Sequence, residues 1–199
     1  MYSLYIDTHD TEIVIGLYKD GNILDSRIKP STRNHSDFTM PLVKEILDSN
    51  NIKVNDLNEI LVVNGPGSFT GVRIGVTIAK TLAYTLNIPI KTITSLEMYA
   101  CGTNDMDKKI VIIRDVKGVF YGLFDKDNNQ IGELEYKSNA DFEEFVSVNN
   151  YKEMLIEEKN IEFNKIYEQM SKKEATLAHK ANPIYIKVIE ALKNDSSSK

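Results

Sequence analysis

The start of the chain alternates between short apolar runs and polar turn residues. Residues 2–6, 12–18 and 22–29 have the apolar and β-branched content of strands. Asp20-Gly21, between the last two runs, is a strong signal for a hairpin turn, because both residue types tolerate positive φ angles. The pattern therefore predicts a three-stranded antiparallel meander.

Helical and strand patterns alternate in the next part of the chain. Residues 36–50 and 69–86 show the apolar spacing of amphipathic helices, and residues 95–101 that of a shorter helix. Residues 59–63 and 90–94 are short apolar runs of the kind found in buried parallel strands. Three antiparallel strands followed by helix, strand, helix and strand predict an α/β ribonuclease-H-like fold, which nucleases, actin and the sugar kinases share.

A polar stretch at residues 102–109 predicts a boundary between two lobes. The N-terminal lobe would comprise residues 1–102, and a smaller C-terminal lobe residues 103–199. We expect residues 151–180 to be mostly helical and the serine-rich tail from about residue 194 to be disordered. The other elements expected here are strands at 110–114, 119–124 and 131–136, a helix at 141–148, and either a strand at 184–186 or a helix at 184–192.

The composition is that of an ordinary soluble globular protein, with 42% hydrophobic residues, 27% charged residues and a formal net charge of −5. No apolar run approaches the ~18 residues of a membrane span. The first residues, MYSLYIDTHD, lack the regions of a secretory signal, and the single Cys101 excludes an internal disulfide framework. We therefore expect a cytoplasmic protein and, because neither half is basic, one that does not hold nucleic acid by itself.

Few residues have the spacing that catalysis requires. A nuclease of this fold needs a cluster of carboxylates for two metal ions. The candidates are Asp7, Glu45 and Asn64, and the last of these is a neutral amide. The three histidines are far apart, so no helix face carries a metal-binding pair. We therefore predict no catalytic residue and no metal site.

Phosphate binding is a separate possibility for two loops. A sugar kinase of this fold needs glycines in the first turn, but residues 8–11 contain none, and Asp10 would repel a phosphate. The loop at residues 65–68 leads into a helix N-terminus, where an anion can bind, although a plain strand-to-helix turn explains it more simply. A small phosphotransferase or nucleotide-binding protein is therefore one possible function, and a non-catalytic scaffold protein is the other. The residues in contact with a nucleotide or phosphate would be Asp7, Thr8, Gly65, Gly67 and Ser68.

The two long helices are more apolar than one sheet face requires. Their apolar positions each cover an arc of roughly 200°, whereas a surface helix that faces only its own core needs about 100°. Small residues also recur at every fourth position of the second helix, which lets another backbone approach. We expect a helical docking surface, although the two helices could instead bury the excess against each other and the second lobe. The expected interface residues are Phe38, Leu42, Ile46, Gly71, Val72, Gly75, Val76, Ala79 and Ala83.

The same segment carries a family resemblance. The sequence NGPGSFTGVRIGVTIAKTLAYTLNIPI at residues 64–90 closely resembles the hallmark segment of the bacterial TsaB (YeaZ) family, which serves the synthesis of N6-threonylcarbamoyladenosine in tRNA. LYIDTHDTEIVIG at residues 4–16 and HSDFTMPLV at residues 35–43 are similar to the same family, and PIYIK at residues 183–187 weakly so. The likeness is strong over residues 1–100. The catalytic paralogue TsaD shares part of the motif, but its metal-binding histidine pair is missing here.

The resemblance implies an actin-like (ASKHA) fold with a reduced second lobe. It also implies a non-catalytic scaffold whose two N-terminal helices pack against the matching helices of TsaD, the subunit that transfers the threonylcarbamoyl group. A TsaE-type ATPase would join the pair, tRNA would bind only through the complex, and ATP or ADP would sit at the junction with TsaD. We expect no cofactor of the chain's own and no membrane contact. Because the apolar surface of the two helices needs cover, we also expect a homodimer through the same helices when TsaD is absent.

Overall fold

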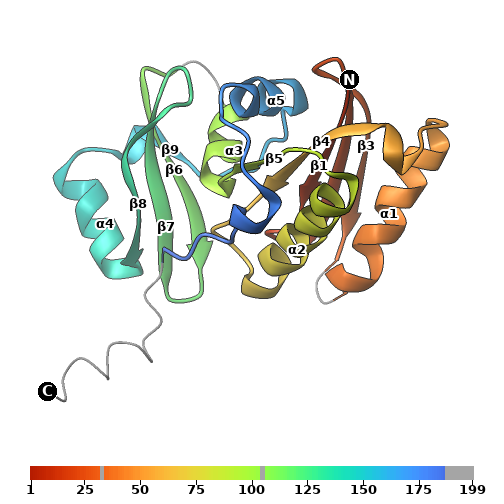
Figure 1. Ribbon diagram of the computed structural model, residues 1–199. Helices are drawn as coiled ribbons and strands as arrows, with labels where there is room; N and C mark the ends of the chain where they lie inside the picture. The colour runs from red at the N-terminus through yellow and green to blue at the C-terminus, as the bar shows by residue number, and fades with distance from the viewer. Residues whose placement is uncertain (32–33, 104–105, 187–199) are drawn as a thin grey trace, which may run out of the picture.

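The computed structural model describes residues 1–31, 34–103 and 106–186, which form two β-sheets with helices on their faces (Figure 1). The first sheet has the strand order β3-β2-β1-β4-β5. Strand β1 lies at its centre, where Ile6 pairs with Ile15 of β2 in antiparallel and with Val62 of β4 in parallel. The strands are β1 (Tyr2–Asp7), β2 (Glu12–Lys19), β3 (Asn22–Pro30), β4 (Leu57–Val63) and β5 (Ile90–Ile93).

Helices cover both faces of this sheet. On one face, α1 (His35–Ser49) and α2 (Phe69–Leu86) pack over a core that includes Leu4 and Ile6 of β1. On the other face, Tyr5 packs in a second core with α3 (Ser95–Cys101) and α5 (Phe163–Ser171). This arrangement confirms the predicted α/β ribonuclease-H-like order. β1 is buried from Ser3 to Asp7 because helices cover the sheet on both faces.

The second sheet is smaller and has the strand order β8-β7-β6-β9. Figure 1 shows α1 at the right, the first sheet beside it with α2 in front, α3 and α5 near the centre, and then the second sheet, with α4 at the far left. The strands predicted at 110–114, 119–124 and 131–136 and the helix predicted at 141–148 are confirmed. The elements are β6 (Lys108–Asp115), β7 (Gly118–Asp125), β8 (Gln130–Ser138), α4 (Asn139–Val148) and β9 (Leu155–Ile156).

The prediction of a mostly helical stretch at residues 151–180 is wrong. Besides α5, this stretch contains short 3₁₀ turns at Lys152–Met154 and Ala178–Lys180 and the strand β9. Leu155 and Ile156 pair in parallel with β6, and this long-range pairing outweighs the local helical spacing. Residues 184–186 belong to no regular element. Residues 187–199, with the predicted tail, lie outside the described part of the chain.

The end of the described chain returns to the first lobe. The Thr176 N–H donates at 2.9 Å to the carbonyl oxygen of Ile90, the first residue of the edge strand β5. The Tyr18 hydroxyl donates to the Phe163 carbonyl oxygen at 2.8 Å. Residues 163–186, which lie within the range predicted for the C-terminal lobe, thus contact the first sheet and α2. No helix in the described part of the chain combines the length and apolar character that a membrane crossing requires.

The small-residue stripe of α2 faces the protein's own sheet. A methyl group at Gly71 would overlap the Thr8 carbonyl oxygen, and one at Gly75 would overlap the Thr8 hydroxyl. The close approach that small residues permit is therefore used inside the lobe. Phe38 is half-buried, with the Lys29 ammonium 4.1 Å from its ring centroid. The other expected interface residues are all buried: Leu42, Ile46, Gly71, Val72, Gly75, Val76, Ala79 and Ala83.

We expect Gly71→Ala to destabilise the protein by about 2 kcal/mol, because the added methyl group meets backbone that cannot move away easily. In an open helix the same change would stabilise by about 1 kcal/mol, so the sign of the effect is informative. Thr77→Ala on the exposed side of α2 is the matched control and should change stability little. Urea denaturation measures both variants. Stabilisation by Gly71→Ala would contradict the close contact between α2 and Thr8.

Candidate functional site

Asp7, at the end of β1, is held by its neighbour His9. The Asp7 carboxylate accepts the His9 backbone N–H at 3.0 Å and lies 2.6 Å from its ring Nδ1. The opposite side of the ring faces Tyr99 of α3, with 5.7 Å between ring centroids. Asp7 and His9 are each about 1% exposed. The first turn is therefore closed around a buried carboxylate–histidine pair.

The electrostatics of Asp7 favour its charged form. Burial alone would raise the pKa of the Asp7 carboxyl, but the charge of His9 and its hydrogen bonds outweigh burial, and the pKa is lowered from its ordinary value. Lys159 contributes in the same direction. Its ammonium lies 3.2 Å from a carboxylate oxygen of Glu12. Asp7 is thus a buried carboxylate that is charged at neutral pH.

The loop at residues 65–68 packs directly on this turn. The Ser68 backbone N–H donates to the His9 carbonyl oxygen at 2.7 Å, and a methyl group at Gly67 would overlap that same oxygen. The Ser95 N–H donates to the Gly65 carbonyl oxygen at 3.0 Å, and the Ser95 hydroxyl donates to Pro66. The loop is therefore a packed strand-to-helix turn, with the Ser68 amide already used inside the protein.

The other predicted phosphate contacts also have internal partners. The Ser68 side chain accepts the Gly71 N–H at 3.2 Å and caps α2, as its residue type suggested. The Thr8 hydroxyl donates to the Gly71 carbonyl oxygen at 2.7 Å. The structure thus brings Asp7, Thr8, Gly65, Gly67 and Ser68 to one edge of the sheet. Most of their polar groups contact the chain itself, whereas Asp7 Oδ2 is buried without a hydrogen-bond partner among the described residues.

The candidate nuclease residues are not gathered around one point. Glu45 lies on the exposed side of α1, where its carboxylate accepts from Arg27 Nε at 3.0 Å. Asn64 is buried, and its side-chain amide donates to the Asn182 carbonyl oxygen at 3.2 Å. Within the residues that the structure describes, no group of three or more His, Cys, Asp and Glu side chains could hold a metal ion.

A cleft of 920 Å³ opens between the two lobes, next to the first turn. His9 and Ser68 line it on one side, and apolar side chains such as Ile112 and Phe120 line it on the other. At its rim, Arg114 Nε donates to Glu157 at 2.6 Å. Asp10, Asp115 and Glu157 line the cleft together with the cations Arg114 and Lys117, so its walls carry charges of both signs.

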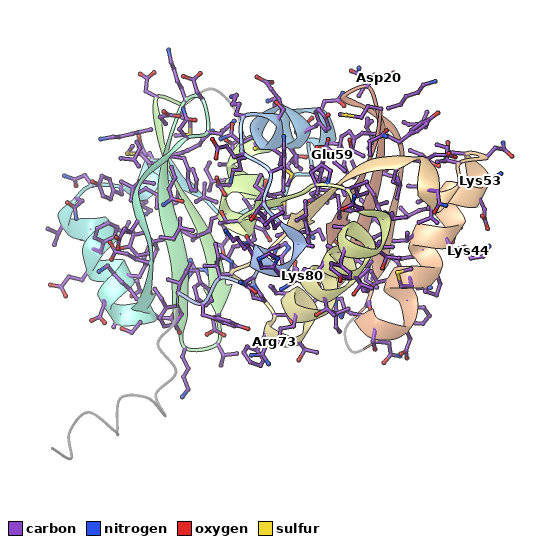
Figure 2. All side chains as sticks on the ribbon, viewed as in Figure 1. Asp20, Lys44, Lys53, Glu59, Arg73 and Lys80 are labelled. Carbon is purple, nitrogen blue, oxygen red and sulfur yellow. The ribbon has the colours of Figure 1, made fainter. Side chains whose placement is uncertain are left out.

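A second hollow lies on the outer side of the two long helices. It has a volume of 490 Å³, and we call it the α1–α2 groove. Met40 is 41% exposed there and Phe69 52%. Arg73 stands on α2 at its edge (Figure 2). The sequence predicted excess apolar surface on these helices but assigned it to the buried side. The lining residues are Ser36, Met40, Phe69, Thr70, Arg73, Ile74, Thr77 and Ile78.

Comparison with known proteins gives two kinds of relative. Residues 22–185 match the model of the family described as TsaD: tRNA N6-adenosine threonylcarbamoyltransferase. The chain is 38% identical over 136 residues to the tRNA threonylcarbamoyladenosine biosynthesis protein TsaB of Bacillus subtilis, covering 67% of this chain and 59% of the relative. It is 31% identical over 135 residues to TsaB of Escherichia coli, covering 66% and 58%. The match therefore spans less than two thirds of these curated relatives.

The solved structure of YeaZ from Pseudomonas aeruginosa has the same fold. It superposes with a TM-score of 0.77 at 18% identity, covering 92% of this chain and 100% of that one. At this identity the likeness shows the fold alone, and it confirms the actin-like architecture that the sequence predicted. With the family match over residues 22–185 and the TsaB relatives, it follows that the chain belongs to the TsaD family and, within it, to the TsaB (YeaZ) proteins.

Proposed function

We propose that this chain is the non-catalytic, TsaB-type subunit of the machinery that forms N6-threonylcarbamoyladenosine beside the anticodon of tRNA. In this role it acts in the cytosol as a scaffold for a TsaD-type transferase. The observation that carries the proposal is the exposed α1–α2 groove in a chain whose relatives are TsaB proteins. An apolar surface of this kind, rimmed by polar residues, is typical of a protein–protein contact.

The described residues offer little support for catalysis by the chain itself. The Asp7 carboxylate is engaged by His9, and the amide of Ser68 is engaged by the first turn. Burial raises the pKa of the Cys101 thiol to about 12, so the thiolate that a nucleophile requires is scarce at neutral pH. These three groups thus support a role for the chain that does not depend on catalysis.

A TsaD-type partner suits the groove because the chain matches the model of that same family. The match at residues 22–185 includes both α1 and α2, so the transferase would carry counterparts of these two helices. Two such helix pairs can pack against each other as a four-helix bundle. The same groove would join two copies of this chain when the transferase is absent.

The remaining partners are proposed from the charge and the family. With a formal net charge of −5, the chain is poorly suited to hold tRNA alone. In our proposal, tRNA reaches the chain only through the complex, and a TsaE-type ATPase joins it. ATP or ADP then binds at the junction with the transferase, on residues that the partner contributes.

We expect Met40→Asp to weaken binding to the transferase by about a hundredfold, or ~3 kcal/mol, because a charge would be buried in an apolar contact. The Kd of the purified pair measures the effect. The fold should persist, since Met40 is already 41% exposed in the isolated chain. Tyr84→Asp is the matched control: Tyr84 is 81% exposed on α2 but lies outside the groove. Equal binding by the Met40→Asp variant and wild type would contradict the assignment of the groove.

We expect Asp7→Asn to destabilise the fold by about 2 kcal/mol at neutral pH, because the charged hydrogen bonds to His9 are weakened. Since the folded pKa of Asp7 is lowered, its contribution is complete above the unfolded value of about 4 and is lost as pH falls through the folded pKa. The stability difference from wild type should therefore shrink in acid, as measured by urea denaturation across pH.

The same variant separates the scaffold from the phosphotransferase alternative. Asp7 has a structural role in our account, so the isolated wild-type chain should not bind ATP at micromolar concentration. Micromolar ATP binding that disappears in Asp7→Asn, at a pH where the variant stays folded, would support the phosphotransferase instead. Isothermal titration calorimetry of the purified chain distinguishes the two.

A further inference from the structure

Three exposed side chains form a compact cluster at the edge of the α1–α2 groove. Arg73 Nε donates to the Tyr185 hydroxyl oxygen at 2.9 Å. The guanidinium carbon of Arg73 lies 3.7 Å from the ring centroid of Phe69 and 5.6 Å from that of Tyr185. The two ring centroids are 5.9 Å apart. The cluster joins the first turns of α2 to a residue at the far end of the described chain.

The position of Tyr185 is set by hydrogen bonds between its segment and Asn64, the residue that follows β4. The neighbouring Ile184 N–H donates to the Asn64 carbonyl oxygen at 2.9 Å, and the Asn64 side chain donates to Asn182 at 3.2 Å. Lys80 of α2, labelled in Figure 2, also donates to the Asn182 side chain at 3.2 Å. Tyr185 itself is 54% exposed, so this anchoring leaves its ring at the surface.

Arg73 has hydrogen-bonding capacity to spare. Its Nε is used by Tyr185, while its terminal nitrogens can still make the forked contact that guanidinium groups form with carboxylates. Among the described side chains, no carboxylate lies within ion-pair distance of Arg73. Stacking on Phe69 restricts the side chain and reduces the entropy that binding would otherwise cost.

We propose that Tyr185 is a positioning residue of the docking surface. It holds Arg73 extended over Phe69, so that the terminal nitrogens of Arg73 face the α1–α2 groove and pair with a carboxylate of the TsaD-type transferase. The inference rests on the proposed function, and it adds to it that the C-terminal part of the chain shapes the contact made by α2. Tyr185 acts through Arg73 and makes no contribution of its own to the partner.

A double-mutant cycle on the Kd for the transferase tests this directly. Tyr185→Phe removes only the hydroxyl, and we expect it to weaken binding about fivefold in the wild-type background. Arg73→Ala should weaken binding about tenfold or more. In the Arg73→Ala background, Tyr185→Phe should not change the Kd further, because Tyr185 affects binding only through Arg73. Arg73→Ala should also reduce the salt dependence of binding, since an ion pair is lost.

The comparison variant is Lys80→Ala, which removes one tether of the same segment but keeps the hydrogen bonds between Asn64 and the segment. It should weaken binding less than Tyr185→Phe does. Equal losses from Tyr185→Phe in both backgrounds, or no loss in the wild-type background, would overturn the inference while leaving the proposed function intact. Failure of the wild-type chain to bind the transferase would overturn both.

Discussion

The close contact between α2 and the turn after β1 determines the rest of the structure. Gly71 and Gly75 bring the helix so near to Thr8 that no side chain fits between them. This contact directs the small-residue side of α2 into the lobe and leaves its opposite side exposed at the α1–α2 groove. It also brings the loop at residues 65–68 against His9. One packing constraint therefore both fixes the loop at residues 65–68 against the turn after β1 and leaves the α1–α2 groove, our proposed docking surface, exposed.

The contact between this loop and the turn has a chemical consequence. In an actin-like fold, a nucleotide requires free backbone N–H groups at the first turn and at the loop before the helix. Here the Ser68 N–H is bound to the His9 carbonyl oxygen, and Asp7 is bound to the His9 side chain. The Ser68 N–H and one oxygen of Asp7 are therefore used inside the protein, while Asp7 Oδ2 is buried without a hydrogen-bond partner in the part of the chain that the structure describes.

Local patterns predicted the elements well, because strands and helices of the first lobe are apolar in the period that each requires. Residues 69–86 were predicted as a helix with the bounds that the structure shows. Which face of that helix packs on the sheet could not be predicted, because an apolar arc of roughly 200° does not show which of its positions contact the chain's own sheet. Residues 155–156 were missed as a strand because their partner is β6. The Arg73–Tyr185 contact joins residues far apart in sequence, so no local signal pointed to it.

The central claim is that this chain supports tRNA modification through the α1–α2 groove. Its most direct test is the level of N6-threonylcarbamoyladenosine in tRNA of cells that normally produce the chain and have been depleted of it, measured by mass spectrometry of digested tRNA. Our account predicts that the level falls on depletion and is restored by the wild-type chain or Tyr84→Asp but not by Met40→Asp. An unchanged level after depletion, or full restoration by Met40→Asp, would contradict it.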